Sequence, residues 1–205
     1  MRLRLFPQEN AGLELLSKMG GVLLSGSATL SEVLGADSGD YERLAEQMHQ
    51  LEAEATNLHF ALMTQMRSSF INPLPREDLY GLSLTLMSAM ENLDAAAEVI
   101  SLYRLTGISR RAAEQLEVIG RQAELTAGAM RRLASLEDLD EYWIEMLRLS
   151  KRSERTHRIW VSELLHEHKP LTYARHRDLA DQLAGTTTSL RQCATAVGAI
   201  LVRES

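Results

Sequence analysis

Six long stretches of this 205-residue chain repeat apolar residues at the spacing of an α-helix, and only short breaks separate them. The apolar face of the third stretch consists of Leu79, Leu82, Leu86, Ala89, Leu93 and Ala96. Because each break is a few residues long, neighbouring helices should pack antiparallel. The pattern predicts an all-α protein with helices at about 8–34, 39–69, 75–105, 109–134, 138–167 and 171–203.

Composition favours a helical protein and argues against several functional classes. Only 5% of the residues are aromatic, while Leu, Ala and Met abound, which favours helix over sheet. The net charge is −6 and no basic stripe is present, which argues against a nucleic-acid binder. The single Cys193 excludes an internal disulfide, fits a reducing compartment, and lies at the spacing of a buried core residue.

The chain has no sequence that predicts insertion into a membrane or export. No run approaches the roughly 20 apolar residues of a membrane span. The N-terminus lacks the long apolar core of a signal peptide. We therefore expect a cytoplasmic protein, with peripheral binding at the inner face of the membrane left open.

A proline-containing joint at residues 70–80 separates the second and third predicted helices. Pro75 suits the first position of a helix, where its missing N–H leaves no partner unsatisfied. Glu77 and Asp78 then lie in the first turn, where carboxylates interact favourably with the helix dipole. The segment predicts a sharp turn followed by a helix.

A short echo half a chain further on indicates an internal repeat. The string Arg-Glu-Asp-Leu at 76–79 opens the third helix, and His-Arg-Asp-Leu at 176–179 lies in the first turns of the sixth. Each string follows a long helix and a proline-containing joint. The echo suggests two three-helix units related by the repeat.

The joint string Phe-Ile-Asn-Pro-Leu-Pro-Arg-Glu-Asp at 70–78 is similar to the Phe-Ile-Thr-Pro-x-Asp-Arg-Glu-Asp string of PhoU-like (PhoU-divergent) phosphate-transport regulators and transporter accessory proteins. The Leu-Phe-Pro-Gln opening at 5–8 resembles the Leu-Phe-Pro-Lys of that family. Segments 52–56 and 86–91 fall where the family carries acidic pairs. The resemblance implies a single domain over 1–205, a six-helix bundle made of two antiparallel three-helix units at about 1–105 and 109–205.

The resemblance also implies pairs of acids, Glu/Asp-x-x-x-Asp, that share a metal on one helix face. This chain departs from the pattern in every pair: the paired positions hold Glu52 and Thr56, Met87 and Glu91, Ser150 and Glu154, and Ala184 and Thr188. Hard cations need several converging anionic oxygens, and each pair supplies at most one. We therefore expect no cofactor and a lost metal cluster, with Glu52, Glu91 and Glu154 as remnant candidates.

Two Glu-x-x-His motifs, at 154–157 and 163–166, leave a second metal reading open, because di-iron bundles use this motif. Both copies lie nine residues apart on one predicted helix, on roughly opposite faces, so they cannot meet at one centre. A di-iron-type oxidoreductase remains an alternative function, and it would need about four to six converging acids. A structural dimeric bundle with an unrelated partner is another.

The function that the resemblance implies is a non-enzymatic adaptor that regulates phosphate transport. Its partner would be a membrane phosphate transporter of the low-affinity type, contacted at the cytoplasmic face by helix surfaces. Arg76, Glu77 and Asp78 are the candidate partner-binding residues. A homo-oligomer is compatible with this reading, and nucleic acid is not an expected partner.

Overall fold

The computed structural model describes residues 11–68 and 72–204, and it forms helices without any strand in those ranges. The elements are α1 (Ala11–Gly35), α2 (Tyr41–Ser68), α3 (Arg76–Tyr103), α4 (Arg110–Arg132), α5 (Leu139–Glu167) and α6 (Pro170–Glu204). The predicted all-α fold of six helices is confirmed. The opening motif at 5–8 and Phe70 of the joint lie outside the described residues.

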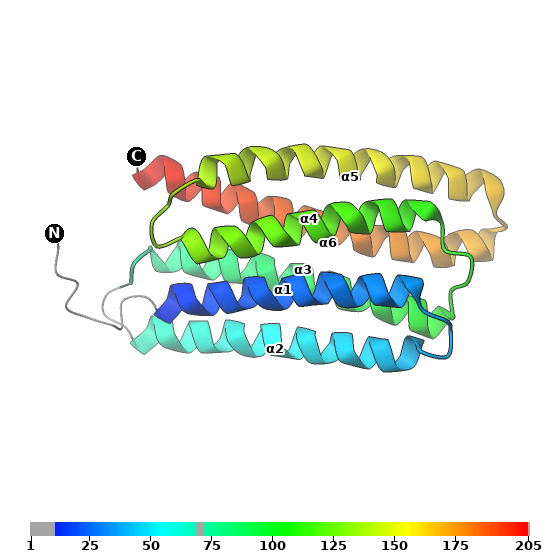
Figure 1. Cartoon of the computed structure of the whole chain (residues 1–205), viewed down its shortest axis with the longest axis horizontal. Helices are drawn as coiled ribbons and strands as arrows, with labels where there is room; N and C mark the ends of the chain where they lie inside the picture. The colour runs from blue at the N-terminus through cyan, green and yellow to red at the C-terminus, as the bar shows by residue number, and fades with distance from the viewer. Residues whose placement is uncertain (1–10, 69–71, 205) are drawn as a thin grey trace.

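Consecutive helices run in opposite directions along one long axis (Figure 1). In the first unit α2 packs against α1 and α3, and in the second α5 packs against α4 and α6. The two units meet through α3 against α6 and α1 against α4. Each unit therefore has an outer helix, α2 or α5, that contacts only its own unit within the described residues.

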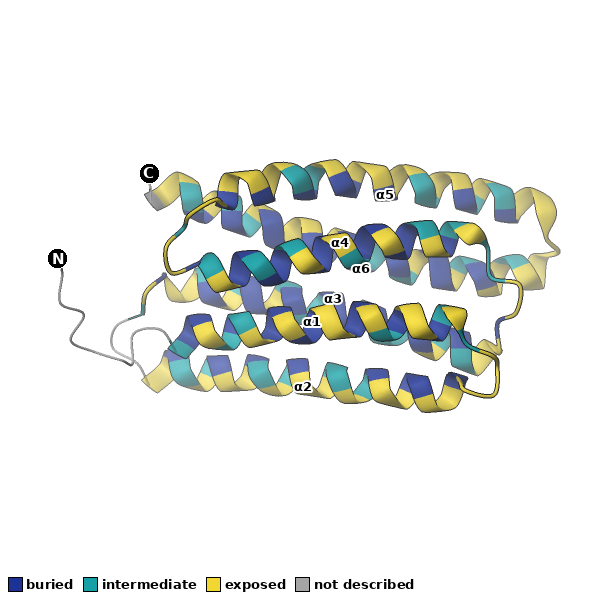
Figure 2. Ribbon diagram, in the orientation of Figure 1, coloured by how far each residue is buried: buried dark blue, intermediate teal, exposed yellow. Residues whose placement is uncertain are grey.

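The inward faces of the helices form one apolar core, and the outward faces are exposed (Figure 2). Every residue of the predicted apolar face of α3 is at most 1% exposed. Fully burying a side chain such as leucine contributes about 1.5–3 kcal/mol. Cys193 is also fully buried, as its spacing predicted, and burial raises the pKa of its thiol to about 11.

An aspartate near the start of one helix contacts the end of the other helix at both ends of the α3–α6 pair. Asp78, at the start of α3, forms an ion pair with Arg203 at the end of α6. Asp178, in the first turns of α6, accepts a hydrogen bond of 3.0 Å from the Tyr103 hydroxyl at the end of α3. The two aspartates belong to the sequence echo and are 100 positions apart. Their partners, Tyr103 and Arg203, are also 100 positions apart. The echo therefore corresponds to equivalent places in the two units.

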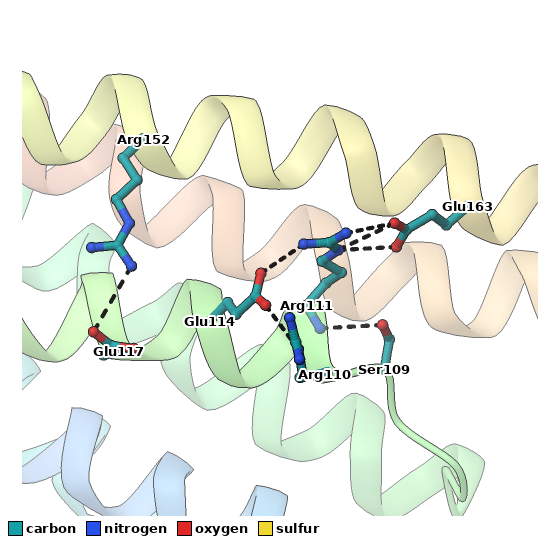
Figure 3. Close-up of polar contacts among 7 residues, drawn as sticks. All are labelled: Ser109, Arg110, Arg111, Glu114, Glu117, Arg152 and Glu163. Carbon is teal, nitrogen blue, oxygen red and sulfur yellow. Dashed lines mark hydrogen bonds and ion pairs between the residues drawn. The ribbon is translucent and has the colours of Figure 1, made fainter.

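The start of α4 is fixed by a cap and an ion-pair cluster (Figure 3). The Ser109 hydroxyl accepts a hydrogen bond from Arg111 N at 3.2 Å, as expected of an N-cap. The Arg111 guanidinium donates to Glu163 of α5 and to Glu114 of its own helix. These bonds hold the pKa of both carboxyls below their usual range. The cluster joins α4 to the far end of α5.

Helix α3 begins one residue later than predicted, so Pro75 precedes the helix instead of being its first residue. It is the N-cap of α3, with an extended backbone at φ −51° and ψ 141°, and the helix begins at Arg76. Its carbonyl accepts hydrogen bonds from Asp78 N at 3.0 Å and Leu79 N at 3.2 Å. The ring therefore occupies a position whose N–H would not have bonded in the helix. Every other predicted helix end inside the described ranges lies within two residues of the observed one.

The glycines in the first helix permit close helix contacts, and α1 runs through them without a break. A Cβ added to Gly20 would lie 3.1 Å from Ala127 Cα, a backbone atom of α4. One added to Gly26 would lie 2.8 Å from the sulfur of Met90 on α3. These glycines let α1 approach both α4 and α3, which gives them a packing role.

Candidate functional site

Two of the three predicted partner-binding residues line an apolar hollow at the joint. Arg76 and Glu77 are exposed and border a hollow of about 300 Å³, together with Met63, Met66 and Tyr80. Apolar surface next to charged side chains is typical of a site that binds another protein. The hollow therefore places the joint in a setting suited to partner contact.

Asp78 lies in a different setting from its two neighbours. Its carboxylate is only 16% exposed and forms the ion pair with Arg203 of α6. A mostly covered side chain is less accessible to a second protein than the exposed Arg76 and Glu77 are. The structure therefore brings Asp78 to the α3–α6 contact and leaves the other two at the surface.

A second apolar hollow lies between the start of α5 and the end of α6. It has a volume of about 590 Å³, and Trp143, Gly198, Val202 and Arg203 are among its lining residues. The Trp143 ring lies directly over Gly198, since a Cβ there would be 3.0 Å from Trp143 Cδ1. Val202 is 79% exposed, so the hollow has an apolar rim.

The residues that line the two hollows lie near the ends of α2 and α6 and the starts of α3 and α5. Figure 1 shows these helix ends at the same end of the bundle. Arg203 lines the second hollow and pairs with Asp78, which follows Glu77 of the first hollow in the chain. We define the joint surface as Met63, Met66, Arg76, Glu77, Tyr80, Trp143 and Val202. Sequence reasoning identified Arg76 and Glu77 of this surface, and missed Trp143 and Val202 because tertiary packing brings them there.

The remnant acids of the first unit do not converge on a metal-type site. Glu52 accepts a hydrogen bond of 2.8 Å from Thr56, which occupies the expected acid position. Glu91 is exposed on α3. Nearby, His49 Nδ1 lies 2.6 Å from Asp94 Oδ1, a pair that sequence reasoning missed. Although partial burial opposes it, Asp94 raises the pKa of His49.

The four positions in the second unit do converge, around one pocket. Ser150 and Glu154 of α5 and Ala184 and Thr188 of α6 all line a pocket of about 110 Å³ between these helices. Arg191 also lines it, and its Nη1 lies 2.6 Å from Glu154 Oε1. Residues 184, 188 and 191 follow helical spacing, so the sequence held a signal for Arg191.

Buried amides of α4 support the wall of this pocket. Gln122 Nε2 donates to Ser150 Oγ at 3.1 Å, and Gln115 Nε2 donates to Ser153 Oγ at 3.3 Å. The Oε1 atoms of both glutamines accept no hydrogen bond from any described residue. Each such buried acceptor costs about 1–3 kcal/mol of stability. These amides hold the Ser150 and Ser153 hydroxyls in place at the pocket.

Neither Glu-x-x-His motif forms a metal centre in the structure. Their side chains have other contacts: Glu154 with Arg191, His157 with Asp181, Glu163 with Arg111, and His166 with the Ser162 carbonyl. Within residues 11–68 and 72–204, no three His, Cys, Asp or Glu side chains are placed to hold a metal ion. The loss of the family-type metal cluster stays a prediction.

The fold and the position of the joint define a PhoU-like helical bundle. A PhoU-like protein from Shewanella oneidensis MR-1 superimposes with a TM-score of 0.75, over 93% of this chain and 99% of that chain, at 11% identity. The chain is also similar, at 21% identity over 206 residues, to a Rhizobium meliloti (strain 1021) protein described as "Putative pit accessory protein". That match covers 97% of this chain and 96% of the relative. No family model matches the chain.

These two similarities confirm the resemblance that the joint string indicated. They extend along almost the whole chain and so include both three-helix units. None of the helices in the described part of the chain is long and apolar enough to span a bilayer.

Proposed function

We propose that this protein is a non-enzymatic accessory protein of phosphate transport that acts by contacting a Pit-type membrane phosphate transporter at its cytoplasmic face. The observation that carries the proposal is the end-to-end similarity to the Rhizobium meliloti protein described as a pit accessory protein. The shared fold with a PhoU-like protein supports it. The apolar hollows at the start of α3 and the end of α6 suit a role as a binding partner.

The joint surface is the contact that we propose for the transporter. Exposed aromatic and arginine side chains often dominate the energetics of protein interfaces. Tyr80 and Trp143 are 42% and 38% exposed, and each borders an apolar hollow with charged residues at its edge. Such a surface would bury apolar area in its centre, and the transporter would cover Arg76 and Glu77 beside it with groups of opposite charge.

We expect Arg76→Ala and Glu77→Ala to reduce phosphate uptake while the protein remains folded. Both residues are exposed at the start of a helix, where their contribution to stability should be below about 1 kcal/mol. Loss of one partner of a buried interfacial charge pair costs about 2–5 kcal/mol of binding. The measurements are radiolabelled phosphate uptake in a strain that lacks the gene, and thermal unfolding of each purified variant.

Asp78→Ala needs its own control, because Asp78 has an internal partner. Arg203→Gln breaks the same ion pair and leaves the Asp78 carboxylate in place. If Asp78 contacts the transporter, Asp78→Ala should reduce uptake more than Arg203→Gln. Normal uptake in every joint variant, accompanied by a lowered melting temperature, would show that the joint is only structural.

We also propose that the family-type metal cluster is absent from this protein. The supporting observation is that Glu52, Glu91 and Glu154 are separated and that Glu154 is held by Arg191. Purified protein is expected to hold well under one iron or zinc ion per chain in elemental analysis. A stoichiometric metal that disappears in the Glu52→Ala, Glu91→Ala double variant would contradict this and revive the di-iron-type alternative.

A further inference from the structure

The pocket between α5 and α6 combines a floor of hydroxyl groups with cationic side chains at its mouth. Ser150, Ser153 and Thr187 form the floor, and each is at most 3% exposed. Arg158 and Arg191 lie at the mouth. The pocket volume of about 110 Å³ is several times the roughly 10–15 Å³ that one water needs, so a small polyatomic ion fits.

The floor offers a hydrogen-bond donor to a guest. A single hydrogen bond of 3.0 Å joins the Ser153 and Thr187 hydroxyls, and it uses only one of their two protons. Gln115 donates to Ser153 from behind and so occupies an acceptor site of that hydroxyl rather than its proton. The remaining proton of the pair can therefore point into the pocket.

The charges at the mouth favour an anion over a cation. Among the described residues, Glu154 is the one carboxylate that lines the pocket, and its oxygens lie 2.6 Å from Arg191 Nη1 and 4.0 Å from Arg158 Nη1. Burial lowers the pKa of His157, which also lines the pocket, so its ring adds a neutral polar group. A single carboxylate beside two guanidinium groups is a poor site for a metal cation.

We propose that this pocket binds a tetrahedral oxyanion, with inorganic phosphate as the ligand. Arginine side chains present several N–H donors in a plane that matches phosphate oxygens, and the hydroxyl floor would contact the innermost oxygen. Glu154 pairs with the guanidinium of Arg191, and an incoming anion would compete with this carboxylate for the same N–H donors. The choice of phosphate rests on the proposed function; the preference for an anion rests on the donors and charges of the pocket.

The test is calorimetric titration of the full chain with inorganic phosphate at constant ionic strength in chloride, and a parallel titration with sulfate. Arg191→Gln is expected to weaken phosphate binding by about tenfold or more, because a charged donor is lost. Glu154→Gln is expected to strengthen it several-fold, because the competing carboxylate loses its charge. A cation site predicts the reverse for Glu154→Gln, so the two variants together fix the sign of the ligand.

Arg121→Gln is the matched control, because Arg121 forms a surface ion pair with Glu124 on α4 and does not line the pocket. It should leave phosphate affinity unchanged, and circular dichroism should show all three variants equally helical. The proposal is overturned if phosphate does not bind saturably, if Arg191→Gln and Arg121→Gln have equal effects, or if sulfate binds more tightly than phosphate. The titration contains no transporter, so an absence of phosphate binding would overturn the pocket proposal only. The uptake measurements on the joint variants test the proposed contact with the transporter independently.

Discussion

Replacing Trp160 with alanine is expected to lower the free energy of unfolding by about 3–5 kcal/mol, the range measured for truncating a large buried aromatic side chain. Trp160 lies on the outer helix α5, is fully buried, and is among the largest buried side chains of the described core. Alanine would leave a cavity that the surrounding helices fill only in part. Chemical denaturation monitored by circular dichroism gives the loss directly.

Trp160→Phe provides the matched comparison. The Trp160 Nε1–H reaches no acceptor among the described residues, so phenylalanine removes a buried donor that has no partner there. The loss should therefore be well below that of alanine, despite the smaller ring. If alanine and phenylalanine destabilise the protein equally, or if alanine costs under about 1 kcal/mol, the packing of α5 differs from the one described here.

Gly185→Ala is expected to destabilise the protein by about 1–3 kcal/mol, the usual cost of overpacking a close contact. Gly185 of α6 faces Asn92 of α3, and an added Cβ would lie 2.9 Å from Asn92 Cγ and closer still to its amide oxygen. Asn92 is held by a hydrogen bond of 2.7 Å from its Nδ2 to the Ser88 carbonyl. The side chain therefore cannot move aside without losing that bond.

The cause of this loss can be tested by removing the residue that the new methyl group meets. Asn92→Ala in the Gly185→Ala background should recover most of the stability, because alanine at 92 leaves room for the Cβ. Gly21→Ala is a second control: its Cβ would meet nothing within 4 Å, so the change should be neutral or stabilising by up to about 1 kcal/mol. Equal melting temperatures for Gly185→Ala and Gly21→Ala would contradict the close α3–α6 contact.

The fold could be predicted from sequence because its signals are local. The apolar face of α3 repeats at helical spacing, and burial follows directly from that repeat. Ser109 was identifiable as a cap because a hydroxyl residue before a helical stretch can bond the free N–H groups. The sequence could not decide whether Pro75 is the N-cap or the first helical residue of α3, because proline fits both positions.

The candidate sites could be predicted only in part, because they depend on contacts between distant segments. The sequence pointed to Arg76, Glu77 and Asp78 as a group, and nothing local separates them. Only the packing of α6 on α3 shows that Asp78 pairs with Arg203, 125 residues away. The amides of Gln115 and Gln122 behind the α5–α6 pocket have no sequence signal either, since helical spacing alone marks them as ordinary inward positions.

The reciprocal ends of the α3–α6 pair have a consequence for how such a bundle can be assembled. Asp78 meets the last residues of α6, and Asp178 meets the last residues of α3, so each half contacts the other through the same places on its surface. This is the geometry of an isologous dimer interface, in which one patch is complementary to itself under a two-fold rotation. Covalent linkage of the halves makes that association independent of protein concentration. Covalent linkage also lets equivalent positions carry different residues, as Tyr103 and Arg203 do, so the two ends of the α3–α6 contact differ in their chemistry.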